Sequence, residues 1–357
     1  MGCKLTLGIF SVSHLVVDFA CFFVLMGSFY TGINDLQVVS LGFLLYNAIA
    51  FVLQVPIGYL ADRFHASRAS HGYFAVFGCL VVILGVVLPL SPWARLALCA
   101  LGNAFFHVGG GIDSLVFANG RYARSGIFIS FGAVGVALGT LVGREELISP
   151  LWVALLLAAC LAGMLRFCLR PKSPYGAVFT HQGAKISAGE VVVYLCMAII
   201  VVRAAVGAYT PITWKSTTFL LILPALAVFA GKFAGGLLAD RFGARAVAAF
   251  SLTVSAPLLA FGNEQVILCC IGLFLFNVTT AVTLCVIASH LPKNPGLSFG
   301  LTTLALFVGT SFSFFWAMPE GLRPALTLAM IAVSVACVLL TTPGKTSGFL
   351  LPSDRPS

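Results

Sequence analysis

The chain has 357 residues, of which 60% are hydrophobic and only 9% are charged, and its mean hydropathy is +1.06. This composition excludes a soluble globular protein and indicates a polytopic membrane protein. The formal net charge of +9 does not indicate a nucleic-acid-binding surface, because the charges lie in short connectors between apolar runs. We therefore expect the lipid bilayer, and no nucleic acid, to cover most of the surface.

A spanning helix needs about 20 mainly apolar residues, and twelve segments meet this requirement. They are 6–32, 37–61, 70–90, 93–118, 123–143, 149–168, 189–209, 216–239, 244–262, 264–289, 297–317 and 323–342. The longest connector, 169–188, separates an N-terminal half (1–168) from a C-terminal half (189–345), which a short tail (346–357) follows. The sequence thus predicts an all-α integral membrane protein with twelve transmembrane helices in two pseudo-symmetric six-helix halves.

Lys and Arg residues gather in the connectors on one side of this arrangement. That side holds, among others, Arg63, Arg68, Arg121, Arg170, Lys172 and Arg241, whereas the other side holds Arg95, Arg144, Lys215 and Arg323. Because positively charged connectors stay on the cytoplasmic side, both termini are predicted to be cytoplasmic. We expect a monomer in the plasma or inner membrane.

One heptapeptide occurs twice, about half a chain length apart. It reads Gly58-Tyr59-Leu60-Ala61-Asp62-Arg63-Phe64 in the first half and Gly236-Leu237-Leu238-Ala239-Asp240-Arg241-Phe242 in the second. Such a repeat indicates two copies of one structural unit. The glycines allow close approach to another helix, the aspartates can cap the N-terminus of a helix, and the arginines can pair with an acid or with lipid phosphate.

On these residues the chain resembles the major facilitator superfamily of transporters. The loop after the second helix of that family reads Gly-x-Leu-Ala-Asp-Arg-x-Gly-Arg-Arg/Lys, which the second copy follows through Gly243 and Arg245, whereas the first departs at His65. The resemblance covers the whole chain. It implies that Asp62 faces the helix start at 295–296 and Asp240 the helix start at 125–126, where these cytoplasmic gating loops brace the two halves in the outward-facing state.

Four glycines of the fifth predicted helix form a second signature. Gly126, Gly135, Gly139 and Gly143 are similar to the antiporter motif of the superfamily, G-x8-G-x3-G-P-x2-G-G, with Thr140 at the proline position and Arg144 at the last glycine. Small residues at this spacing indicate close helix packing. Beyond packing, the motif favours export over uptake.

Ionisable residues inside the membrane cost about 2.5–3.5 kcal/mol each, so each one indicates a functional site. His14 and Asp18 are four residues apart on one helix face, and Asn103 and His107 repeat this spacing on another helix. The pairs His14-x3-Asp18 and Phe106-His107 are similar to the fosmidomycin-resistance branch of drug exporters. A histidine at this depth binds a proton or a substrate, or is a neutral, hydrogen-bonded core residue.

Three further polar residues complete the expected site. Arg203 lies at nearly the same predicted depth as Asp18, so we expect the two to face each other across a central cavity, either as a proton-coupling pair or as a permanent ion pair. Asn277 corresponds to His107 in the second half. Asp113 lies nearer the cytoplasm and suits a pair with Arg63.

Lys232 lies two helical turns before Asp240. Its long side chain either extends to the cytoplasmic interface or binds an anionic substrate, and the sequence leaves both interpretations open.

The sequence favours a secondary transporter that works by alternating access. We expect proton-coupled export of a small organic compound. The alternative is a proton-coupled symporter for uptake of a small organic anion or nutrient. The sequence contains no P-loop, no zinc-binding HExxH and no nucleophile–base arrangement, so we expect no enzyme, no cofactor and no bound metal.

Overall fold

The long apolar runs form helices in the computed structural model. The structure describes residues 2–33, 35–65, 71–118, 120–169 and 189–342, and these residues form helices and loops without a β-strand. The helices are α1 (Gly2–Val24), α2 (Leu36–Asn47), α3 (Gln54–His65), α4 (Gly72–Val87), α5 (Pro92–Ala118), α6 (Tyr122–Arg144), α7 (Pro150–Phe167), α8 (Gly189–Tyr209), α9 (Thr218–Phe242), α10 (Ala244–Phe261), α11 (Val266–Asn277), α12 (Thr279–His290), α13 (Pro295–Phe315) and α14 (Arg323–Thr341).

Eleven helical segments of the described residues are long and apolar enough to cross a membrane, and the 16-residue helix α4 is a shorter twelfth. The predicted all-α fold with twelve membrane helices is therefore confirmed. π-helical turns at Leu25–Tyr30 and Ala48–Val52 interrupt the first two segments. The predicted helix 264–289 breaks between α11 and α12 at Val278. The linker 169–188, apart from Leu169, and the tail 346–357 lie outside the described residues.

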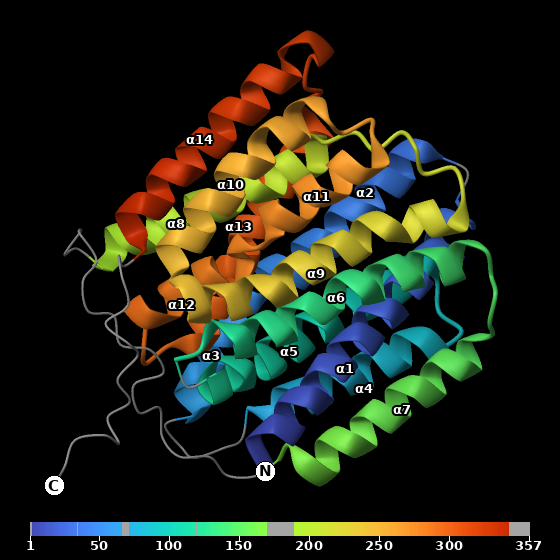
Figure 1. The fold of residues 1–357 in the computed structure, drawn as a ribbon. Helices are drawn as coiled ribbons and strands as arrows, with labels where there is room; N and C mark the ends of the chain where they lie inside the picture. Colours follow the sequence, from blue (N-terminus) through green and yellow to red (C-terminus); the bar gives the residue numbers. More distant parts are fainter. Residues whose placement is uncertain (1, 34, 66–70, 119, 170–188, 343–357) are drawn as a thin grey trace, which may run out of the picture.

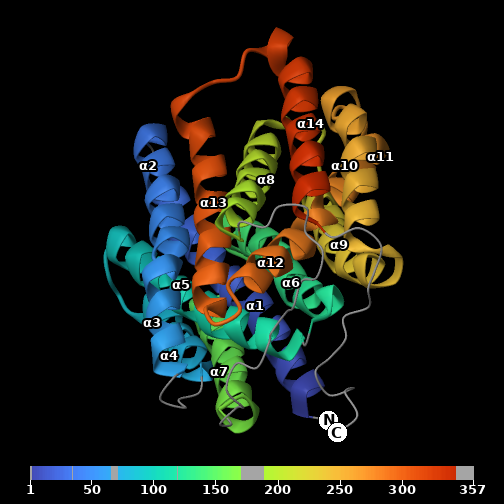
Figure 2. The ribbon, with the colours of Figure 1, turned by 90° about the vertical axis from the view of Figure 1, so that its left-hand side faces the viewer.

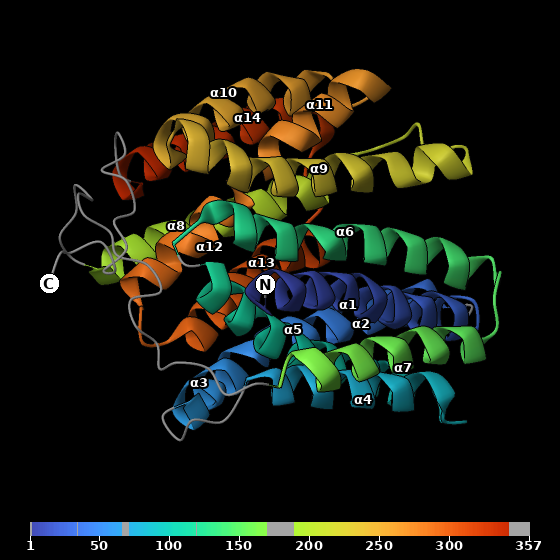
Figure 3. The ribbon, with the colours of Figure 1, turned by 60° about the horizontal axis from the view of Figure 1, so that its bottom comes forward.

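The helices form two groups that meet along two lines of contact. Helix α1 packs against α5, α6 and α7, while α8 contacts α13 and α14, and α10 contacts α11 and α14. Between the groups, α6 lies along α9 (Figure 1 and Figure 3) and α3 lies along α13 (Figure 2). These two contacts hold the molecule together across its middle.

The contact between α1 and α6 is close because α6 carries glycines where the helices meet. A Cβ atom there would overlap a backbone carbonyl of α1: that of Leu15 for Gly135, of Phe19 for Gly139, and of Phe23 for Gly143. Gly126 instead faces α9, where a Cβ would lie 2.9 Å from the carbonyl oxygen of Lys232. All four glycines of the predicted motif therefore serve close helix packing.

Candidate functional site

A buried polar cluster lies where α1 and α5 meet. It consists of His14 and Asp18 from α1 and of Asn103 and His107 from α5, and each is less than a tenth exposed. The spacing of four residues places each pair on one face of its helix, and the packing of α1 on α5 brings the two faces together. Four predicted site residues thus form one cluster, which we call the His–Asp cluster.

Hydrogen bonds fix the orientation of both histidine rings. Nδ1 of His14 lies 2.8 Å from the carbonyl oxygen of Phe128 on α6, and Nδ1 of His107 lies 2.9 Å from the carbonyl oxygen of Asn103. A carbonyl oxygen only accepts, so we assign a proton to Nδ1 of each ring. The Nε2 atoms of His14 and His107 then face each other at 2.8 Å.

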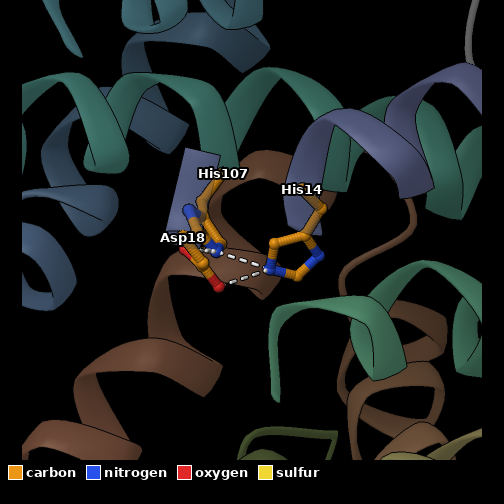
Figure 4. A group of neighbouring side chains, drawn as sticks. All are labelled: His14, Asp18 and His107. Carbon is orange, nitrogen blue, oxygen red and sulfur yellow. Dashed lines mark hydrogen bonds and ion pairs between the residues drawn. The ribbon is translucent and has the colours of Figure 1, made fainter. Parts of the chain in front are cut away.

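This geometry suits an additional proton between the two rings. Two neutral rings would point the lone pairs of their Nε2 atoms at one another, whereas one proton between them forms an N–H···N hydrogen bond. The carboxylate of Asp18 balances the resulting charge, since its oxygens lie 3.2 Å from Nε2 of His14 and 3.6 Å from Nε2 of His107 (Figure 4). Asn103 donates to the same carboxylate at 2.8 Å.

The cluster also has the ligand types of a metal site, because one atom each from His14, Asp18 and His107 lies within 4.8 Å of the others. Two imidazole nitrogens bound to a tetrahedral Zn²⁺ at about 2.0–2.1 Å would be separated by roughly 3.3 Å. The observed Nε2–Nε2 distance of 2.8 Å is instead that of a hydrogen bond. The geometry therefore suits a proton better than a metal ion.

Gly132 of α6 makes room for the cluster. A Cβ at this position would lie 2.5 Å from both Oδ2 of Asp18 and Nε2 of His14. The residue is absent from our predicted site, although its place in the glycine-rich face of α6 was visible in the sequence. Its role depends on the packing of α1 against α6.

A cavity of about 630 Å³ lies between α6, α8 and α9. Arg203 and Asn277 line it, but no residue of the His–Asp cluster does. Nη1 of Arg203 donates to the hydroxyl of Thr283 at 3.4 Å, while Asp18 is held within the cluster. The expectation that Asp18 and Arg203 face each other across the cavity is thus wrong for this conformation, because Asp18 contacts His14, His107 and Asn103 and does not line the cavity.

The first copy of the repeated heptapeptide ties α3 to α13. Asp62 accepts hydrogen bonds from the backbone nitrogens of Gly296 and Leu297, both at 2.8 Å. These nitrogens belong to the first turn of α13, whose N–H groups lack partners within the helix. Asp62 is only 8% exposed, and Gly58 lets the backbones approach, since a Cβ there would overlap the carbonyl of Gly296.

The second copy makes the same contact between α9 and α6. Asp240 accepts from the backbone nitrogens of Tyr122 at 2.9 Å and Ala123 at 3.0 Å, and Gly236 packs against the carbonyl of Tyr122. The resemblance implied a contact at 125–126. The helix begins at Tyr122, so its free N–H groups lie slightly earlier in the chain. Unlike Asp62, Asp240 is exposed.

The expected pair of Arg63 with Asp113 is wrong for this conformation. Asp113 is fully buried and lies 3.8 Å from Nδ1 of His71. Arg63 is exposed; its guanidinium lies 4.6 Å from the ring centroid of Tyr59 and donates to the hydroxyl of that residue. Arg241 similarly lies 5.2 Å from the ring centroid of Phe242. Both arginines thus remain at the surface.

Comparisons with protein-family models and with curated protein sequences found no match. Solved structures of transporters share the arrangement of helices, three among them as follows. The transporter FucP in the outward conformation is 13% identical with a TM-score of 0.64, covering 96% of this chain and 99% of that chain. The E. coli fucose:proton symporter FucP (14%, 0.63) and the human organic anion transporter MFSD10 (12%, 0.65) each match 96% of this chain and 100% of theirs.

The chain has the major facilitator superfamily fold. The contacts of Asp62 and Asp240 join α3 to α13 and α9 to α6, and we call these two contacts the latch. The cavity reaches the end of the molecule opposite these contacts, where Tyr30, Arg144 and Lys215 line it. That end is the one that the Lys and Arg distribution assigns to the exterior. The similarity to fosmidomycin-resistance exporters stays a prediction.

Proposed function

We propose that this chain is a proton-coupled secondary transporter that moves a small organic solute by alternating access. The observation that carries the proposal is the hydrogen bond between Nε2 of His14 and Nε2 of His107 beside the carboxylate of Asp18. With one proton the cluster is neutral overall. Within the membrane-spanning helices a neutral cluster is much cheaper to bury than a charged one.

Loss of the proton would change the packing of α1 against α5. Two Nε2 lone pairs would then face each other, and the charge of Asp18 would keep only the hydrogen bond from Asn103. Either the rings separate or water enters, and both changes move α1 relative to α5. Proton occupancy would in this way bias the equilibrium between two conformations, which is what coupling requires.

The direction of transport is a separate question. The sequence favours export because of the glycine motif in α6. The contacts of Gly135, Gly139 and Gly143 with α1 account for that motif by packing, so it says nothing further about direction. The alternative, proton-coupled uptake of an organic anion, is supported by Arg203 in the cavity.

Proteoliposomes that contain a pH-sensitive dye test the proposal and its direction together. A panel of small sugars, carboxylates and hydrophobic cations is added outside, and protein-free liposomes correct for passive entry. We expect at least one compound to change the internal pH with wild-type protein and none to do so with Asp18→Asn. Acidification indicates symport and alkalinisation indicates antiport. Flux of a compound without any proton movement would overturn the proposed coupling.

A further inference from the structure

The charged side chains that line the cavity are all basic in the part of the chain that the structure describes. Four of its lining residues are basic, namely Arg144, Arg203, Lys215 and Lys232, and none of the lining residues that the structure describes is Asp or Glu. Arg144 and Lys215 lie toward the outer end, where Arg144 pairs with Glu145 at 3.7 Å, whereas Arg203 and Lys232 come from the middle of α8 and α9. A cleft with charges of one sign concentrates ligands of the opposite sign.

Arg203 lacks part of its hydrogen bonding. Its side chain is 6% exposed, Nη1 has only the 3.4 Å contact with Thr283, and Nη2 has no hydrogen-bond partner among the described residues. A buried guanidinium without a partner costs free energy. Nη2 is itself covered, but the residue lines the cavity, so a small rotation of the guanidinium would let an acceptor on a bound ligand satisfy it.

Lys232 brings a second cation to the same place. It lines the cavity and lies within electrostatic range of Arg203, and no carboxylate is found among the described lining residues. Two nearby cations repel each other, and an anion between them removes this repulsion. Of the two interpretations of Lys232 that the sequence left open, its position in the cavity favours anion binding.

The walls of the cavity are suited to an apolar body. Met26, Leu273 and Phe276 provide apolar surface, while Asn277 and Thr280 offer polar groups. A volume of about 630 Å³ lies in the usual range for small-molecule sites, roughly 300–1,000 Å³. The combination fits a molecule with one anionic group and an apolar or mixed remainder.

We propose that Arg203 and Lys232 form the binding site for the anionic group of a small organic carboxylate or sulfonate. This proposal rests on the proposed transport function for its physiological meaning, but the site itself can be tested by binding alone. It also predicts how the solute is coupled to the proton.

Helix α6 connects the anion site with the His–Asp cluster, because Gly132 lies against Asp18 and His14 and the next residue, Ala133, lines the cavity together with Lys232. Lys232 also lies within electrostatic range of Asp18 and of His107. Cys21, Tyr46 and Asn103 also adjoin Asp18, but they are neutral groups. The protonated cluster is neutral and leaves Lys232 to attract the anion. A deprotonated cluster carries a negative charge that repels the anion. Proton and anion therefore bind cooperatively, which corresponds to symport.

Calorimetric titration of the detergent-solubilised full chain tests the site with two matched pairs, phenylacetate with phenylacetamide and benzenesulfonate with benzenesulfonamide. We expect the anion of each pair to bind at least about tenfold more tightly than its amide. Arg203→Gln and Lys232→Gln should each weaken anion binding roughly 10- to 100-fold. Arg203→Lys should restore part of the affinity, and Lys4→Gln, at the exposed start of α1, should leave it unchanged.

Equal binding of anion and amide, or unchanged affinity in both Gln variants, would overturn the anion site. Wild-type affinity for benzenesulfonate should rise as the pH falls from 8 to 6, and His107→Gln should abolish this rise. Binding that ignores pH would overturn the coupling. Anion binding without flux in proteoliposomes would support the anion site and contradict the transport function. Flux of neutral compounds alone would support the transport function and contradict the anion site.

Discussion

At the scale of single residues, the account depends on a proton between two histidines. His14 and His107 each donate a hydrogen bond from Nδ1–H to a backbone carbonyl, so only an added ion can lie between their Nε2 atoms. Asp18 supplies the charge that makes this ion stable within the membrane. A neutral, hydrogen-bonded core histidine, the other interpretation of the sequence, would not explain two Nε2 atoms at 2.8 Å.

Replacement of His107 should remove the proton while keeping a polar side chain. We expect His107→Gln to lower proton-driven flux at least about tenfold and to flatten its dependence on pH between 6 and 8, because Gln does not titrate. His290→Gln is the matched control, since His290 contacts Val286 and Ser289 on its own helix, outside the cluster. A His107→Gln protein with the wild-type pH profile would exclude the cluster from coupling.

The geometry of the His–Asp cluster can be tested at Gly132 by a substitution that changes only the side-chain volume. Gly132→Ala places a methyl group against Asp18 and His14 and should abolish coupled flux in a protein that still inserts and purifies. Gly163→Ala adds the same methyl group where the nearest atom, on Ile9, is 3.6 Å away, and flux should remain near wild type. Equal flux in the two variants would contradict the geometry of the cluster.

Removal of metal ions should have no effect. The short Nε2–Nε2 distance fits a proton, so flux after dialysis against EDTA should equal flux before it. Loss of flux on chelation, restored by Zn²⁺ but not by Mg²⁺, would show that His14, Asp18 and His107 bind a metal ion instead.

At the scale of helices, the latch has two arms of unequal burial. Asp62 and Asp240 both cap helix starts across the line between the two groups, but Asp62 is buried whereas Asp240 is exposed. Water can replace a lost hydrogen bond at an exposed site but not readily at a buried one. The two arms should therefore differ in strength.

We expect Asp62→Asn to destabilise the described conformation by about 1–3 kcal/mol and Asp240→Asn to do so by less. An Ala137→Cys probe in the cavity wall reports the effect through its labelling by an impermeant thiol reagent added outside. Labelling should fall more with Asp62→Asn than with Asp240→Asn. The parent protein without the Ala137→Cys substitution is treated with the same reagent and corrects for labelling of its own cysteines. Equal decreases would contradict the asymmetry.

At the scale of the whole molecule, the sequence predicted the helices and their number but not all of the contacts between them. Apolar run length determines where helices form, and the resemblance implied which helices Asp62 and Asp240 contact. The partner of Asp18 was mistaken because depth along a helix does not tell which way a side chain points. The same holds for Asp113, which meets His71 rather than Arg63. Contacts between helices depend on rotation and register, which one sequence does not display.

The arrangement separates the two sites that transport would couple. The His–Asp cluster lies between α1 and α5, the cavity lies between α6, α8 and α9, and Lys232 is within electrostatic range of both. Under the proposed function, the described state would suit loading from the end that the cavity reaches, which the Lys and Arg distribution predicts to be the outer one. Release would require both arms of the latch to open.

The most direct test of the account is ¹⁵N NMR of the protein labelled at its six histidines, reconstituted in lipid at pH 7. Comparison with His14→Gln and His107→Gln assigns the two signals. We predict protonated Nδ1 atoms on both rings and one further proton shared between their Nε2 atoms, seen as a coupling across the hydrogen bond. Two Nε2 atoms without a proton, or an unprotonated Nδ1 on either ring, would contradict the central claim.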